Sequence, residues 1–169
     1  YADARRLYER SLAIRERALG PDHRDVASSL NNLAGVLRAL GDYERAKPLF
    51  ERALAIVEKV LGRDHPDVAS SLGNLAGLLK VQGEFAAARP LYERAIEILE
   101  RAWGKDHREV AGMVNNLATL LQKQGKLAEA QALFERSLAI QERTWGPDHP
   151  NVASNVHKLA TNLHQQGSY

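Results

Sequence analysis

Four aspartate–histidine pairs are the residues of this sequence that could do metal chemistry. They are Asp22-His23, Asp64-His65, Asp106-His107 and Asp148-His149. Successive pairs are 42 residues apart, so they fall in equivalent loops of successive repeats. Packed helices lie about 10 Å apart, which is too far for two such loops to share one ion. We therefore predict that each pair forms the start of a helix and that the chain has no metal site there.

A second candidate site is formed by His157 and His164, which lie two helical turns apart with Thr161 between them. A metal or anion site at this place is an alternative to a solvated helix face. The sequence contains no nucleophile–base arrangement, phosphate-binding glycine loop or His-Glu-x-x-His motif. These observations predict that the chain is not an enzyme and uses no cofactor.

The composition places few limits on function. Hydrophobic residues make up 44% and charged residues 26% of the 169, which is typical of a soluble globular protein. The net charge of +2 does not favour a nucleic-acid or membrane-surface binder. The absence of cysteine excludes disulfides and thiolate metal sites, and no apolar run approaches the ~18 residues of a membrane span. We expect a cytoplasmic protein that makes no membrane contact.

An internal repeat of 42 residues is the main signal in the sequence. One glycine series falls at Gly20, Gly62, Gly104 and Gly146, and a second at Gly41, Gly83, Gly125 and Gly167. Apolar positions between the glycines keep the same interval. We predict one array with a partial repeat at 1–19, full repeats at 20–61, 62–103 and 104–145, and a final helix within 146–169.

Each repeat is predicted to form two antiparallel helices, called here the A helix and the B helix. In the first full repeat the A helix spans roughly 25–40, because Val26, Leu30, Leu33 and Leu37 recur at helical spacing. A glycine then ends it, and the B helix spans roughly 43–61. Strand patterning is absent. The sequence therefore predicts an all-α, right-handed superhelical solenoid of eight helices, with a helix at 1–19 and another at 151–166.

Two kinds of residue give further expectations for the B helices. Pro48 and Pro90 fall about one and a half turns inside a B helix, so we expect a slight bend or a late start there. Trp103 and Trp145 take the place of leucines at the end of the B helix. We therefore expect both indole rings to lie in the core.

The stretch from Leu61 to Ala76 reads Leu-Gly-x-Asp-His-Pro-Asp-Val-Ala-x-x-Leu-x-Asn-Leu-Ala. It resembles the 42-residue tetratricopeptide repeats of kinesin light chains, and the resemblance extends over essentially the whole chain. The resemblance implies a scaffold with a concave groove, lined by A helices, that holds an extended peptide of a partner protein. The coiled-coil region that precedes those repeats in a kinesin light chain is missing here, so attachment to a motor does not follow.

The family pattern also implies which residues line this groove. Our candidate peptide-binding residues are Asn31, Asn32, Arg38, Asn74, Lys80, Asn115, Asn116, Lys123, His157 and Lys158. Asn32, Asn74 and Asn116 occupy one repeat position, and an asparagine amide both donates to and accepts from a peptide backbone. The alternative is that each asparagine braces a neighbouring helix.

The distribution of charge indicates which peptides would suit the groove. After its opening residue, no A helix contains aspartate or glutamate, although each contains a lysine or arginine on the groove side. Such a basic, amide-rich face favours an acidic, extended peptide. RNA binding is less favoured because few aromatic residues fall on this face for base stacking.

The first helix carries apolar residues, including Leu7 and Leu12, at positions that are internal in the other repeats. We predict an exposed apolar end near residues 1–19, covered by preceding repeats or by another molecule. A repeat array needs polar ends or further partners. End-to-end self-association through residues 1–19 is therefore the alternative function, a structural module in which the groove has no role.

Overall fold

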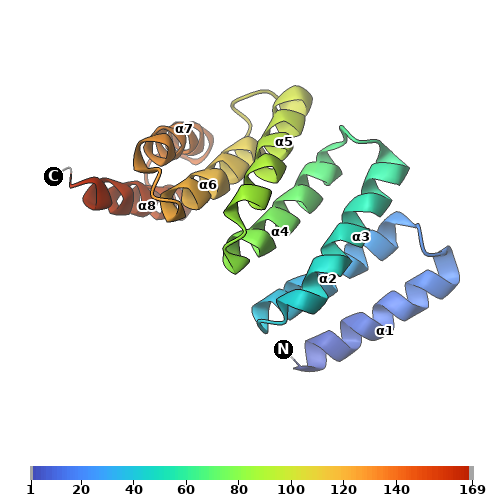
Figure 1. The fold of residues 1–169 in the computed structure, drawn as a ribbon. Helices are drawn as coiled ribbons and strands as arrows, with labels where there is room; N and C mark the ends of the chain where they lie inside the picture. The colour runs from blue at the N-terminus through green and yellow to red at the C-terminus, as the bar shows by residue number, and fades with distance from the viewer. Residues whose placement is uncertain (1, 168–169) are drawn as a thin grey trace. The chain divides into compact units, whose positions relative to one another are not determined.

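The computed structural model describes residues 2–167, and this part of the chain consists of helices joined by short turns (Figure 1). The helices are α1 (Ala2–Leu19), α2 (Arg24–Ala39), α3 (Tyr43–Leu61), α4 (Pro66–Gln82), α5 (Phe85–Trp103), α6 (Arg108–Lys123), α7 (Leu127–Trp145) and α8 (Pro150–Gln166). The described residues form no strand. The A helices are α2, α4, α6 and α8, and the B helices are α1, α3, α5 and α7. The predicted all-α fold with eight helices is confirmed.

A histidine directly precedes every A helix and caps its start. In His23, His65, His107 and His149 the ring atom Nδ1 accepts a hydrogen bond from the backbone N–H two residues later, at N–N distances of 3.1–3.3 Å. This bond satisfies one of the backbone donors that a helix start leaves without a partner. The predicted role of the Asp-His pairs as helix starts is confirmed, and the imidazole itself is the cap.

A left-handed glycine ends helix α4. Gly83 has φ 81° and ψ 4°, and its N–H donates to the carbonyls of Leu79 and Lys80. The N–H of Glu84 then donates to the Leu79 carbonyl at 2.9 Å. A side chain at Gly83 would strain this backbone conformation, which glycine adopts freely. The turn that results ends the last helix of the first unit within two residues of Gln82.

Tyr1–Glu84 form the first of two compact units. Within it α1 packs on α2, α2 on α3, α3 on α4, and the two A helices α2 and α4 also touch. Ala34, Ala46 and Ala53 are fully buried, and these small side chains let the helices approach closely. Phe50 and Leu30 are buried as well, and each contributes about 1.5–3 kcal/mol through burial.

Phe85–Tyr169 form the second compact unit. Here α5 packs on α6, α6 on α7 and α7 on α8, and the A helices α6 and α8 touch. The core repeats that of the first unit, since Tyr92, Phe134, Ala95, Ala118 and Ala130 are all buried. Each unit therefore places two A helices side by side against the B helix that connects them.

The structure corrects two sequence-based expectations for the B helices: the alternative of a late start at the proline, and the core position of Trp103. Helix α3 begins at Tyr43 and contains Pro48, so the proline does not delay its start. The lost hydrogen bond falls within the first two turns, and Glu44, whose carbonyl would have been its acceptor, is an exposed residue. Trp103 is also not in the core: it is 46% exposed, and its ring lies on the His107 ring with centroids 4.6 Å apart. This indole contacts the ring of the residue that caps the next helix.

Candidate functional site

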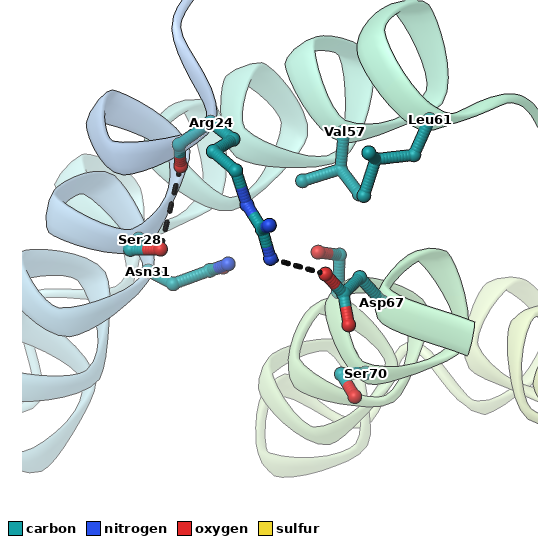
Figure 2. Close-up of a pocket in the computed structure, with 8 residues that line it drawn as sticks. Arg24, Ser28, Asn31, Val57, Leu61, Asp67 and Ser70 are labelled. Atoms are coloured by element: carbon teal, nitrogen blue, oxygen red, sulfur yellow. Dashed lines mark hydrogen bonds and ion pairs between the residues drawn. The ribbon is translucent and has the colours of Figure 1, made fainter. Parts of the chain in front are cut away.

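A pocket lies between the two A helices of the first unit (Figure 2). Its volume is about 240 Å³, and it is closed on one side by the end of the B helix α3. The lining residues are Arg24, Ser28 and Asn31 of α2, Val57 and Leu61 of α3, and Asp67, Ser70 and Ser71 of α4. Most of these side chains are polar, so the pocket suits hydrogen-bonding groups rather than an apolar ligand.

An ion pair crosses this pocket. Figure 2 shows the Arg24 guanidinium reaching from α2 toward Asp67 on α4, and the two side chains are 3.0 Å apart. Both are about half exposed. A pair of this kind contributes only about 0–1 kcal/mol to stability, because water screens it and two long side chains must be ordered. A ligand could therefore displace the ion pair with little loss of stability.

Asn31 is the groove candidate that contributes to this pocket. Its side chain points into the space between α2 and α4, and its Oδ1 atom is buried without a hydrogen-bond partner. The Ser28 hydroxyl donates to the Arg24 carbonyl at 3.3 Å. Asn31 thus offers an acceptor that the protein itself leaves open.

A second pocket, of about 280 Å³, occupies the equivalent place between the A helices of the second unit. Except for Arg24, every residue lining the first pocket has a counterpart 84 residues later that lines the second. These counterparts are Gly112, Asn115, Gln141, Trp145, Asn151, Ser154 and Asn155, and they are joined by Asn116 and Lys158. The two pockets are therefore one repeated feature with different side chains.

A chain of hydrogen bonds runs through the second pocket. The Lys158 ammonium group donates to Asn115 Oδ1 at 2.6 Å, and Asn115 Nδ2 donates to Asn155 Oδ1 at 2.9 Å. Partial burial lowers the pKa of Lys158 from its ordinary value, because the charged form loses contact with water. No carboxylate lines this pocket, whereas Asp67 lines the first. The second pocket is therefore the more electropositive of the two.

The pockets bring some of the predicted groove residues together and leave others out. Asn31 lines the first pocket, and Asn115, Asn116 and Lys158 line the second. The remaining candidates lie on A helices outside both pockets: Asn32, Lys123 and His157 are exposed, and Arg38, Asn74 and Lys80 are half-buried. Asn115 is itself buried and already bonded on both sides. It serves the second pocket by orienting its neighbours.

Sequence reasoning missed two residues of the second pocket, Gln141 and Asn155. Gln141 lies in the B helix α7 at a repeat position that carries Arg15, Val57 and Leu99 in the other copies. Asn155 likewise lies at a repeat position that carries Ser29, Ser71 and Met113 in the other copies. An amide at a repeat position that carries no amide in the other copies is the signal that could have identified both.

Residues 2–167 contain no group of three or more histidine, aspartate or glutamate side chains that could hold a metal ion. His157 is exposed, and its carbonyl accepts a hydrogen bond from the Thr161 hydroxyl at 2.9 Å. Within the same part of the chain, no helix has the length and apolar character to cross a membrane.

Comparisons with known proteins give a consistent result. The model of the tetratricopeptide repeat family matches residues 1–56, 25–101 and 109–169. The crystal structure of BtubC (BKLC) from P. vanneervenii is similar, with 26% identity and a TM-score of 0.85 over 99% of this chain. The nearly identical TPR-like repeats of a kinesin light chain-like protein from Podosopora anserina are 29% identical, with a TM-score of 0.81 over 98% of this chain.

This chain spans 66% of the BtubC chain and 79% of the Podosopora anserina chain. No curated protein matches the sequence at a significant level. The similarity to the two structures agrees with the helix-pair repeat seen in each unit. It also supports the kinesin light chain-like type of repeat that the sequence resembles.

Proposed function

Because this chain belongs to the tetratricopeptide repeat family, we propose that it is a scaffold whose A helices hold an extended, acidic peptide of a partner protein. Tetratricopeptide repeats are protein–protein interaction scaffolds and are typically non-enzymatic. The proposal includes no catalytic step and no cofactor. A cytoplasmic location stays a prediction from the sequence.

The observation that carries this proposal is the repetition of a polar pocket between paired A helices. Both pockets are open to solvent, and both offer amide or hydroxyl groups at matching repeat positions. An extended peptide presents a backbone N–H and C=O at every residue, so regularly spaced amides can bind it through the main chain. A peptide therefore fits this repetition better than a compact small molecule does.

The acidic character of the peptide is inferred from the charges of the A helices. Beyond the first turn, α2, α4, α6 and α8 contain no carboxylate. They carry Arg38, Lys80, Lys123 and Lys158. The carboxylates belong mainly to the B helices, for example Glu51 and Glu97. A peptide with several aspartate or glutamate residues would be attracted to such a surface, and salt would weaken the attraction.

Fluorescence anisotropy with acidic, neutral and basic extended peptides at low and moderate salt tests this proposal. We expect acidic peptides to bind most tightly and to lose affinity as salt rises. Asn74→Ala and Lys80→Glu should each weaken binding about tenfold, since each removes a hydrogen bond or reverses a charge on the groove side. Glu51→Gln on the B helix α3 is the control and should leave binding unchanged.

Two outcomes would count against the proposal. Equal affinity for acidic and basic peptides would remove the argument from charge. Absence of binding by any peptide, with the protein shown to be folded by circular dichroism, would remove the peptide-binding role itself.

Self-association is a second candidate function, and exposed apolar residues of α1 favour it. Leu7 is 60% exposed and Ile14 is 53% exposed, and their spacing of two helical turns puts them on one stripe. The predicted exposed apolar end is therefore present, and a further copy of the chain is one molecule that could cover it. Leu19, at the end of the same helix, is 45% exposed.

Light scattering across a wide range of protein concentration decides whether this stripe drives assembly. If it does, the measured mass should rise with concentration, and Leu7→Glu should keep the protein monomeric. Arg10→Glu on the same helix provides a control that adds negative charge without removing an apolar contact. A monomer at all concentrations would eliminate self-association as the function.

A further inference from the structure

We propose that the second pocket is a binding site for an amide group, filled by the side-chain carboxamide of an asparagine or glutamine in the bound peptide. The inference deepens the proposed function and rests on it for the source of the amide. It concerns Gln141 and Asn155 in particular, which the sequence did not identify as site residues.

The orientation of the Asn155 amide is fixed by the hydrogen-bond chain that begins at Lys158. An ammonium group can only donate, so the Asn115 atom that it meets must be the carbonyl oxygen. The other end of the Asn115 amide is then a donor, and the Asn155 atom that it meets must be a carbonyl oxygen as well. It follows that the remaining atom of the Asn155 amide is a nitrogen with two N–H groups.

This Asn155 nitrogen has no partner. Asn155 is 1% exposed, and its Nδ2 atom is buried without a hydrogen bond. A buried donor left in this state costs about 1–3 kcal/mol relative to a satisfied one, so native proteins rarely keep one without a reason. The atom belongs to a pocket-lining residue, so a ligand in the pocket can supply the missing acceptor.

Gln141, in the same pocket, needs a hydrogen-bond donor, whereas Asn155 needs an acceptor. It is 8% exposed, and its Oε1 atom is buried without a partner. The pocket therefore lacks one acceptor for Asn155 and one donor for Gln141. A carboxamide carries a carbonyl oxygen and an N–H group on a single carbon, so it offers both of the groups that Asn155 and Gln141 lack.

Other side-chain chemistries fit less well. A carboxylate has no proton to donate to Gln141, and an ammonium group has no lone pair for Asn155. An alkyl side chain would leave both protein atoms unsatisfied. A hydroxyl group could serve both atoms but would fill little of a 280 Å³ cavity. The aromatic face of Trp145, which also lines the pocket, suits the flat carboxamide.

The first pocket lacks this pair of groups, which makes it an internal comparison. Val57 stands where Gln141 stands in the second pocket, and Ser71 stands where Asn155 stands. The changes Gln141→Val and Asn155→Ser therefore introduce residues that the fold already accommodates at equivalent positions. They remove the amide site with little disturbance of packing.

Nuclear magnetic resonance provides a direct test that does not require a known partner. The side-chain NH₂ signals of Asn155 are followed while acetamide, N-methylacetamide or acetate is added to the whole chain. Acetamide represents a side-chain carboxamide, N-methylacetamide a main-chain amide, and acetate a carboxylate. We expect acetamide to shift the Asn155 signals in a saturable way and acetate not to shift them.

Three outcomes would overturn the assignment. A saturable shift with N-methylacetamide but not acetamide would show that the main chain, not a side chain, fills the pocket. A larger shift with acetate would show a carboxylate site. Absence of a saturable shift with any of the three would show that the second pocket binds neither an amide nor a carboxylate.

Peptide binding supplies an independent arm. In an acidic peptide that binds, each position is replaced in turn by glutamine, glutamate and leucine. One position should prefer glutamine by about tenfold, and the preference should disappear in Gln141→Val or Asn155→Ser. Gln131→Val, which removes a carboxamide from α7 outside the pocket, should keep the preference.

The two arms separate failure of this inference from failure of the proposed function. If peptides bind but no position prefers glutamine and acetamide causes no shift, the amide site is wrong and the scaffold function stands. If no peptide binds but acetamide shifts Asn155 saturably, the amide site stands and the peptide-binding function is wrong.

Discussion

At the scale of single residues, the repeated histidines show how one side chain serves structure in place of chemistry. Serine, threonine, aspartate and asparagine are the usual residues at a helix start. Here the Nδ1 atom of an imidazole accepts the same hydrogen bond, at 3.1 Å from the Asp67 nitrogen in the case of His65. The Asp-His pairs thus resemble metal ligands in sequence and act as helix caps in the structure.

Replacement of His65 tests this capping role. His65→Ala should lower the free energy of unfolding by about 1 kcal/mol, because the Asp67 N–H loses its acceptor. His65→Asn should retain most of the stability, since asparagine caps helices well. Urea unfolding followed by circular dichroism measures both variants. Equal loss of stability in the two would show that the imidazole ring stabilises by packing and not by capping.

The ion pair between Arg143 and Asp106 gives a pH-dependent prediction at the same scale. The two terminal guanidinium nitrogens of Arg143 donate to the carboxylate, at 3.1 and 2.7 Å, and this contact lowers the pKa of Asp106. A carboxyl group whose pKa is lowered in the folded state stabilises the fold at pH values above its ordinary pKa. This stabilisation is lost as the pH falls through the lowered pKa. The exposed position of the pair makes the effect small.

Arg143→Gln should therefore be slightly less stable than the original chain at neutral pH and equally stable in strong acid. The Asp106 pKa, followed by NMR titration, should return toward its ordinary value. A stability difference that does not change with pH would mean that Arg143 acts through its contacts with the Ala139 carbonyl or through packing.

At the scale of elements, helix α8 departs from the other A helices by burying amides. Asn162 is fully buried where α4 and α6 have Leu78 and Leu120. Its Nδ2 atom donates to the Leu127 carbonyl at 2.9 Å, while its Oδ1 atom has no partner. One hydrogen bond thus accompanies one unsatisfied buried acceptor.

Asn162→Leu should raise the free energy of unfolding by about 1 kcal/mol. The change removes the unsatisfied acceptor and restores the apolar residue of the equivalent positions. Thermal or urea unfolding measures the effect, and Asn162→Ala, which leaves a cavity, should instead lower stability. A destabilised leucine variant would show that the bond to Leu127 outweighs the unsatisfied oxygen.

The elements are also where the sequence predicted most. Glycines at fixed intervals and apolar stripes of helical period located all the helices: the helix expected at 43–61 is Tyr43–Leu61, and that at 25–40 is Arg24–Ala39. These signals are local, because a helix needs only its own backbone bonds and one apolar face. The features that the sequence did not predict depend on contacts between different elements. Trp103 is half exposed beside the His107 ring and not in the core, and the repeat pattern alone did not indicate this contact.

The candidate site was predicted only in part, for a related reason. The sequence placed Asn31, Asn116 and Lys158 on the groove side of the A helices, and these residues line pockets. It did not indicate that Gln141 of a B helix reaches the same space. Which side chains share a pocket depends on contacts between helices, and the repeat pattern alone does not specify those contacts.

At the scale of the whole molecule, both units carry the same arrangement of two A helices, a connecting B helix and a polar pocket. Repetition of this kind suits a ligand that is itself repetitive, and a peptide in extended conformation has that property. Side chains that differ between the pockets, such as Asp67 and Asn151, would then give each unit its own preference.

The most direct test of this account is an NMR titration of the chain with an acidic, extended peptide, followed through the backbone amide signals. The account predicts that the shifted signals belong mainly to α2, α4, α6 and α8 and surround the two pockets. Shifts confined to the B helices, or to α1 alone, would contradict it and would place the functional surface elsewhere.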